Sequence, residues 1–366
     1  MRKLSLFILS LALVACLDPT VPEFQLEEAF YLVEGRILAG EQGSEIRVQE
    51  SDFREANKQF LPVARATVLS REEGGEEALW ELDDAEKGTY IPPAGFTAAP
   101  GQTWHFDVVL PDGTVIESTP ETIPEPVLVN ALNIRFEQNA EFDEGRNRFI
   151  PRFEIFLDYD DPADRENFYA FDYRYWEKVI VCATCEFGRW RNGECLEDPF
   201  NFRFDYLCDT DECFSLTQGV QTIYGNDELT NGSNIRDFEV GGVEFDVFGI
   251  MLVEGILLSI TPEAYDYGKV IQDLTTGNSG LNATIPSALN GNVRNVDPDG
   301  KTVLGYLGAA STGRLRNWVE RNIDVGTPLP FDNMLRLEPS VGTFVPPRAP
   351  CEVDGRSAQR PEGWPE

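Results

Sequence analysis

The sequence is poor in basic residues and has almost no histidine. Its 366 residues include 30 Lys and Arg against 63 Asp and Glu, and one His, which gives a formal net charge of −33. Nucleic-acid binding depends on a basic surface against phosphate, so this balance excludes it. A single His also excludes most chemistry that needs several imidazoles. With 42% apolar residues, the chain is still suited to fold around a hydrophobic core.

Familiar catalytic motifs are missing as well. The chain contains no Gly-x-Ser-x-Gly, no phosphate-binding glycine loop and no His-Glu-x-x-His. We therefore predict that the protein is not an enzyme, has no catalytic residues and uses no cofactor. The carboxylate pair of a glycosidase leaves no local pattern in a sequence, so a hydrolase stays an alternative.

Long hydrophobic runs are absent after the first sixteen residues, which read MRKLSLFILSLALVAC. Basic residues followed by a short apolar run are typical of a secretory signal. The run is too short for a membrane-spanning helix, which needs roughly 20 residues. We expect residues 1–15 to be a signal peptide.

The signal ends in Leu13-Val14-Ala15-Cys16, which resembles the lipobox of bacterial lipoproteins. The resemblance implies cleavage before Cys16 and its acylation. Lipid chains contribute about 0.8 kcal/mol per buried methylene, so such a residue would anchor the protein to a membrane. Residues 16–27 then form a lipidated tether. The alternative is a simple secretory signal with a coincidental Cys.

Short alternating runs dominate the next part of the chain. Residues 103–110 alternate between apolar and polar, and Pro111-Asp112-Gly113 follows as a turn into the next run, which is a hairpin pattern. Several such runs, separated by Gly, Pro and Asp, predict an immunoglobulin-like β-sandwich over residues 28–121. Three prolines within Thr119–Pro126 indicate a domain boundary there.

A larger, mainly β domain is expected over residues 127–345, with a Cys-rich insertion at 182–213 and a Pro-rich tail at 346–366. Thr261 and Pro262 have the residue types of a helix N-cap and first helical position, so one short helix is predicted near 262–274. The predicted fold class is therefore mainly β: an immunoglobulin-like sandwich, then a β-rich domain with one helix and a Cys-stapled insertion.

Six cysteines follow Cys16, and an even number in an exported chain favours disulfides. A zinc knuckle or a thioredoxin-like redox pair at Cys182 and Cys185 are the alternatives. The disulfide candidates are Cys182, Cys185, Cys195, Cys208, Cys213 and Cys351.

Aromatic residues recur at every second position of one predicted strand: Tyr169, Phe171, Tyr173 and Tyr175. Such a stripe favours a sandwich core over a sugar-stacking surface. The opposite face of that strand is expected to be solvent-facing. Trp190 and Phe200 lie in the Cys-rich insertion, where no regular core is expected, and are the candidates for contact with a ligand or partner.

One loop is crowded with carboxylates, which calcium prefers as ligands. On so acidic a chain, a solvated surface is the alternative reading. The weak calcium candidates are Asp158, Asp160, Asp161 and Asp164.

A series of short motifs, in order along nearly the whole chain, resembles a family. They are Leu32–Gly35, Val63–Val68, Gly88–Tyr90, Pro100–Trp104, Pro111–Pro126, Tyr169–Trp176, Glu263–Tyr267, Pro286–Asn292, Gly305–Ala309 and the Cys351–Trp364 tail. The series resembles a Bacteroidota surface-lipoprotein family classified as a domain of unknown function (number four-two-four-nine). The tail departs from the family pattern, with Asp354 where a second Cys is expected.

The resemblance implies a partner and a location. Such proteins are usually encoded beside SusC-like TonB-dependent outer-membrane receptors. We therefore expect a non-catalytic binding or accessory lipoprotein for a nutrient transporter, lipid-anchored to the outer membrane and exposed at the cell surface. The alternatives are a structural or adhesive surface module and, less favoured, a hydrolase that depends on calcium or on carboxylates.

Overall fold

The computed structural model describes residues 29–329 and 348–366, apart from 41–42, 53–58, 183, 187, 192–193, 198–202, 206, 209–210, 276–290, 350 and 353–354. The predicted signal peptide, Cys16 and most of the tether lie outside the described residues. Within them the chain is mainly β with one short helix, which confirms the predicted fold class.

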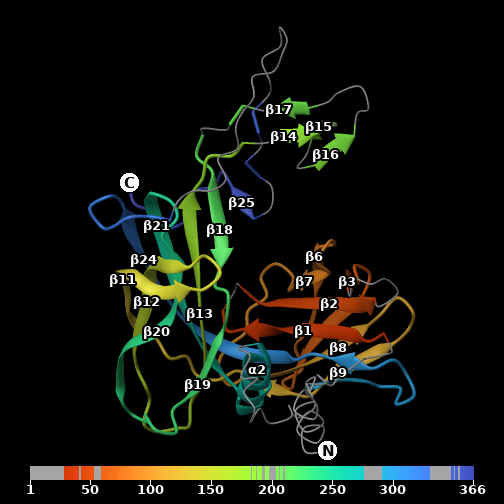
Figure 1. Ribbon diagram of the computed structural model, residues 1–366. Helices are drawn as coiled ribbons and strands as arrows, with labels where there is room; N and C mark the ends of the chain where they lie inside the picture. The colour runs from red at the N-terminus through yellow and green to blue at the C-terminus, as the bar shows by residue number, and fades with distance from the viewer. Residues whose placement is uncertain are drawn as a thin grey trace, which may run out of the picture.

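The first part of the chain forms a sandwich of two sheets (Figure 1). One sheet contains β1 (Tyr31–Leu38), β2 (Glu45–Asp52), β3 (Gln59–Pro62), β6 (Glu81–Asp84) and β7 (Thr89–Ile91). The other contains β4 (Thr67–Glu72), β5 (Glu77–Leu79), β8 (Thr103–Val109), β9 (Val115–Ser118), β10 (Glu121–Thr122) and β22 (Val293–Asn295). The hairpin predicted from the 103–118 pattern is present as the antiparallel pair β8–β9. Its inward residues Trp104, Phe106 and Val108 are buried in the sandwich core.

A single long sheet continues from this sandwich into the second part of the chain. Its order is β25-β18-β13-β21-β24-β1-β2-β7-β6, and the link is the parallel pairing of β24 with β1. The remaining strands of this sheet are β13 (Phe168–Lys178), β18 (Phe214–Gln218), β19 (Ile223–Asn226), β21 (Gly249–Ile260), β23 (Val303–Leu304), β24 (Leu307–Arg321) and β25 (Arg356–Ser357). The domain boundary predicted between residues 121 and 127 stays a prediction. The pairing of β24 with β1 shows that one hydrogen-bonded sheet contains strands from both sides of this boundary.

A smaller sheet covers one face of the long one. It consists of β11 (Val129–Asp143), β12 (Arg148–Asp160) and β20 (Asn234–Glu244). Between the layers, Tyr169, Phe171 and Tyr173 are at most 4% exposed, and Tyr175 is partly buried and packs against the same core, which confirms the aromatic stripe as sandwich core. The layers approach closely at Gly255, where a Cβ would lie 2.5 Å from the Cδ2 atom of Leu157.

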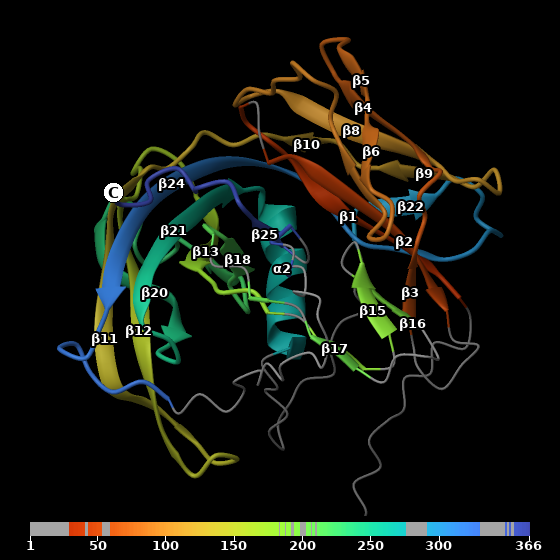
Figure 2. The same ribbon diagram turned by 90° about the horizontal axis from the view of Figure 1, so that it is seen from above.

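The one helix in the described part of the chain, α2 (Pro262–Thr275), lies where it was predicted. The Oγ1 atom of Thr261 accepts a hydrogen bond from the backbone N–H of Ala264 at 3.2 Å, as an N-cap does. Figure 2 shows β21 and β24 curving as an arch, with α2 on its inner side, between β13 and β1. At Gly268 the helix meets β19 so closely that a Cβ would lie 2.1 Å from the ring of Tyr224.

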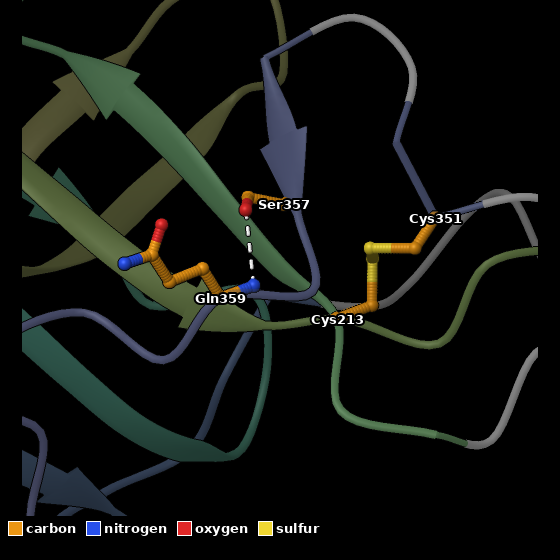
Figure 3. Close-up of a disulfide and its surroundings, with 4 residues drawn as sticks. All are labelled: Cys213, Cys351, Ser357 and Gln359. Carbon is orange, nitrogen blue, oxygen red and sulfur yellow. Dashed lines mark hydrogen bonds between the residues drawn. A yellow bond between two sulfur atoms is a disulfide. The ribbon is translucent and has the colours of Figure 1, made fainter.

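The Cys-rich insertion contains β14 (Thr184–Glu186), β15 (Gly188–Arg191), β16 (Glu194–Glu197) and β17 (Arg203–Asp205). Cys182 pairs with Cys208 inside it. Cys213 reaches instead to Cys351, with 5.7 Å between the Cα atoms, and this bond ties the tail to the start of β18 (Figure 3). Cys185 is also disulfide-bonded, and the side chain of Cys195 lies outside the described residues. The disulfide interpretation is therefore confirmed over the zinc and redox alternatives for the cysteines that are described.

Candidate binding site

The acidic loop proposed for calcium is used in contacts within the fold. Asp161 is buried and accepts hydrogen bonds from Tyr169 and from the backbone N–H of Gly232. Asp160 forms an ion pair with Arg236 at 2.9 Å. The two others differ: Asp158 accepts a hydrogen bond from a backbone N–H, and Asp164 is exposed. In the described part of the chain, no three His, Cys, Asp or Glu side chains gather as a metal site would require.

The contact candidates of the insertion cannot be placed in the same way. The backbone of Trp190 belongs to β15, but its side chain lies outside the described residues, as does the whole of Phe200. Their role stays a prediction.

A cavity that the sequence did not predict lies beneath α2. Its volume is about 240 Å³, it is open to solvent on one side, and it is lined by residues of α2, β1, β13, β19, β21 and β24. Its floor is made of small residues, Ala170, Gly308 and Ala310. Small side chains on the sheet opposite a helix leave the space that larger ones would fill. The polar and aromatic wall consists of Glu34, Arg36, Tyr224, Tyr267 and Tyr306.

Glu34 and Arg36 place opposite charges on this wall. They occupy alternate positions of β1 and therefore point to the same face of the sheet. Arg36 makes no hydrogen bond or ion pair with any residue that the structure describes. Glu34 accepts only a long hydrogen bond, 3.5 Å from the hydroxyl of Tyr267. Burial raises the pKa of Glu34 above its usual value, although Arg47 on the next strand opposes this.

Two tyrosines form the aromatic part of the wall. The rings of Tyr267 and Tyr306 are stacked, with centroids 5.1 Å apart and an angle of 30° between their planes. Tyr306 donates a hydrogen bond to the buried carboxylate of Glu121, which also accepts one from Thr261. Burial raises the pKa of both tyrosines, so their hydroxyls stay protonated at neutral pH.

A charged band, here Asp172, Arg174, Glu254, Arg314 and Arg316, continues from the cavity along the same face of the sheet. Glu254 is only 2% exposed and forms ion pairs with the Nε atoms of Arg174 at 2.5 Å and Arg316 at 2.7 Å. This face of β13 was expected to be solvent-facing, and its Asp172 and Arg174 are instead half-buried. Asp172 packs beside Gly219, where a Cβ would lie 2.8 Å from its Oδ1 atom, and the C-terminal tail lies on Arg316, which donates a hydrogen bond to the carbonyl of Glu362 at 2.7 Å.

The third arginine of the band is Arg314. It makes no ion pair or hydrogen bond with the described residues, although part of its side chain is exposed. Burial of its guanidinium and the proximity of three other arginines hold its pKa below the usual value. Burial likewise raises the pKa of Asp172, whose nearest cations include Arg36. Together with Glu362 of the tail, which pairs with Arg316 at 3.3 Å, the band holds three arginines and three carboxylates, and Arg314 is the arginine without an ion pair in the described structure.

The described residues thus define a mainly β protein with a small charged cavity under its single described helix. The chain belongs to the family described as a domain of unknown function, DUF4249, whose model matches residues 17–316. No curated protein and no solved structure matches the chain. None of the helices in the described residues combines the length and the apolar character needed to cross a membrane.

Proposed function

We propose that the protein is a lipid-anchored outer-membrane binding protein that works with a SusC-like TonB-dependent receptor in nutrient uptake. The observation that carries the binding role is the cavity, because its wall offers a carboxylate and a guanidinium whose own partners are weak or absent among the described residues. Charged groups in a small cavity with aromatic walls are what recognition of a polar small molecule needs.

The kind of wall favours holding a ligand over transforming it. The tyrosine hydroxyls keep their protons, and the stacked rings supply a flat surface against which a ligand can pack. A binding protein that delivers its ligand to a transporter needs such reversible contacts.

The anchor and the partner are supported by the chain's first residues and by its family. The lipobox-like end of the signal would place the acyl chains on Cys16, and the tether from there leads into β1, the strand that carries Glu34 and Arg36. Membership of the family supports the link to a TonB-dependent receptor.

Gentle detergent extraction of the native lipoprotein, followed by affinity capture and mass spectrometry, tests this proposal. We expect a TonB-dependent receptor in stoichiometric amount. A matched Cys16→Ala variant should leave the membrane fraction and lose the receptor. If the native protein came out alone, the transport role would be wrong and a structural or adhesive module would take its place.

A further inference from the structure

Glu34 and Arg36 line one cavity, carry opposite charges and do not neutralise each other. We propose that the cavity binds a small zwitterion of the amino-acid type, with its ammonium group at Glu34, its carboxylate at Arg36 and its side chain against Tyr267 and Tyr306. This assignment rests on the proposed function as a binding protein and specifies its ligand.

The case for a carboxylate begins with Arg36. On a chain with 63 acidic residues, a guanidinium has many chances to find a carboxylate, yet Arg36 makes no ion pair with the described residues. The nearby Asp172 acts on it only at longer range, and burial weakens the ionisation of that carboxyl. The neighbouring Arg314 has no ion pair in the described structure either. Arg36 is exposed and lies opposite Glu45 in the register of β1 and β2, yet no ion pair forms between them. Planar guanidinium groups bind carboxylates through two parallel hydrogen bonds, so a ligand carboxylate would fill donors that Arg36 leaves to water.

The case for an ammonium group begins with Glu34. Its carboxylate is half-buried, and its one described hydrogen bond, from Tyr267, is 3.5 Å long. The other nearby cation, Arg47, projects from the adjacent strand and is exposed. A primary ammonium offers three N–H donors, and the faces of the tyrosine rings add a favourable cation–π surface.

The geometry restricts the ligand to a small molecule with its charges close together. Residues two apart on a strand have Cα atoms about 7 Å from each other, so the two side chains reach into one space. The cavity of about 240 Å³ lies below the range of roughly 300–1,000 Å³ that suits drug-sized ligands. An oligosaccharide or a long peptide therefore does not fit inside.

The pairing of charges also separates a zwitterion from simpler ions. Glu34 would repel an inorganic phosphate or a plain organic anion drawn to Arg36. Arg36 and Arg314 would repel a simple amine drawn to Glu34. Only a ligand that carries both charges can pair with Glu34 and with Arg36.

Isothermal titration calorimetry on the full-length, detergent-solubilised protein tests the inference. The probes are free L-amino acids, each with its amide, which lacks the carboxylate, and its N-acetyl derivative, which lacks the ammonium. Inorganic phosphate serves as the plain anion. We expect at least one free amino acid to bind, and both of its capped forms to bind about tenfold or more weakly, as loss of a charged contact does.

Two variants assign the two ends of the ligand. In Arg36→Met the free amino acid and its amide should bind alike, because the contact with the carboxylate is gone. In Glu34→Gln the free amino acid and its N-acetyl derivative should bind alike. Arg294→Met, which removes an exposed arginine paired with Glu117 on the sandwich, is the matched control and should bind as the native protein does. Thermal unfolding of each variant verifies that it folds.

Three results would overturn the inference. In the first, inorganic phosphate binds the native protein as tightly as any amino acid does and binds Glu34→Gln more tightly still. This would make the cavity a plain anion site. Another is amides or N-acetyl derivatives that bind as well as the free forms. The third is no binding by any probe at about 10 mM, the range of very weak complexes. Recovery of the receptor by affinity capture would still support the transport role in each of these cases, so the two proposals fail separately.

Discussion

The strands β13, β21 and β24 have one apolar and one charged face, although the two faces share the same backbone hydrogen bonds. One face presents Tyr169, Phe171 and Leu257 to the smaller sheet, and all three are at most 1% exposed. The other presents the cavity wall and the charged band to α2 and the tail. Removal of apolar area from water stabilises the first face, whereas the second depends on matched charges. The difference shows that a strand can serve the fold with one face and leave the other for recognition.

The largest loss of stability should follow truncation on the apolar face. Phe153 of β12 is fully buried, and its ring lies 5.1 Å from that of Phe136 and 5.3 Å from that of Phe245. Phe153→Ala should cost about 3–5 kcal/mol because it removes buried area and leaves a cavity. Urea unfolding measures the change. Phe149→Ala, on the same strand but 52% exposed, is the control and should cost far less; equal losses would contradict the proposed packing.

Cutting the tail's covalent tie should have the next largest effect. The Cys213–Cys351 disulfide joins residues 138 positions apart and holds the tail beside β18. Replacing both cysteines by Ser should cost about 2–4 kcal/mol, because the unfolded chain gains freedom. Limited proteolysis should then cut within residues 351–366 first. If the tail of the variant resisted the protease as well as the tail of the native protein does, packing alone would be shown to hold the tail on the charged band.

On the charged face, removal of one carboxylate should cost somewhat less. Glu254→Gln leaves Arg174 without its anion and leaves Arg316 only the exposed carboxylate of Glu362. Fully buried pairs lose about 3–5 kcal/mol on such a change, and here we expect about 2–3 kcal/mol because both arginines are partly exposed. Glu117→Gln, which breaks the exposed pair with Arg294, should cost at most about 1 kcal/mol. If the two changes cost the same in urea unfolding, the charged band would be an ordinary solvated surface.

The smallest expected effect is a dependence on pH at Glu121, where the two halves of the chain meet. Burial raises the pKa of Glu121 in the folded protein above 4.5, the usual value of a glutamate carboxyl. The folded state therefore binds this proton more tightly than the unfolded chain. The resulting stabilisation is fully present below pH 4.5 and is lost as the pH rises through the raised pKa.

Glu121→Gln should remove this dependence. The amide keeps an oxygen for the hydroxyl of Tyr306 and carries no charge to bury. Relative to the native protein, the variant should gain stability between acidic and neutral pH, measured as the difference between urea unfolding curves at several pH values. A difference that stays constant over this range would contradict the assignment of a raised pKa.

Much of the fold could be predicted because its signals are local. The alternation of aromatic residues along one strand predicted that Tyr169, Phe171 and Tyr173 face the core. The residue types of Thr261 and Pro262 predicted where α2 begins. The pairing of β24 with β1 could not be predicted in this way, since it joins segments about 270 residues apart without a local signature.

The candidate site escaped prediction for a related reason. Glu34 and Arg36 read as ordinary polar positions of a strand, and only the folded chain brings Tyr267 and Tyr306 over them. That Arg314 has no ion pair in the described structure is equally invisible in a sequence that is acidic throughout. The half-buried state of Asp172 arises from the segment at Gly219 that packs beside it, which the sequence of β13 does not show.

The central claim is that the face of the sheet beneath α2 receives the ligand. Hydrogen–deuterium exchange of the full-length protein, with and without a mixture of free L-amino acids, tests it most directly. The account predicts slower exchange in peptides that cover residues 31–38 and 262–275, and no change in the insertion at 182–213. Protection confined to the insertion, where Trp190 and Phe200 lie, would contradict it.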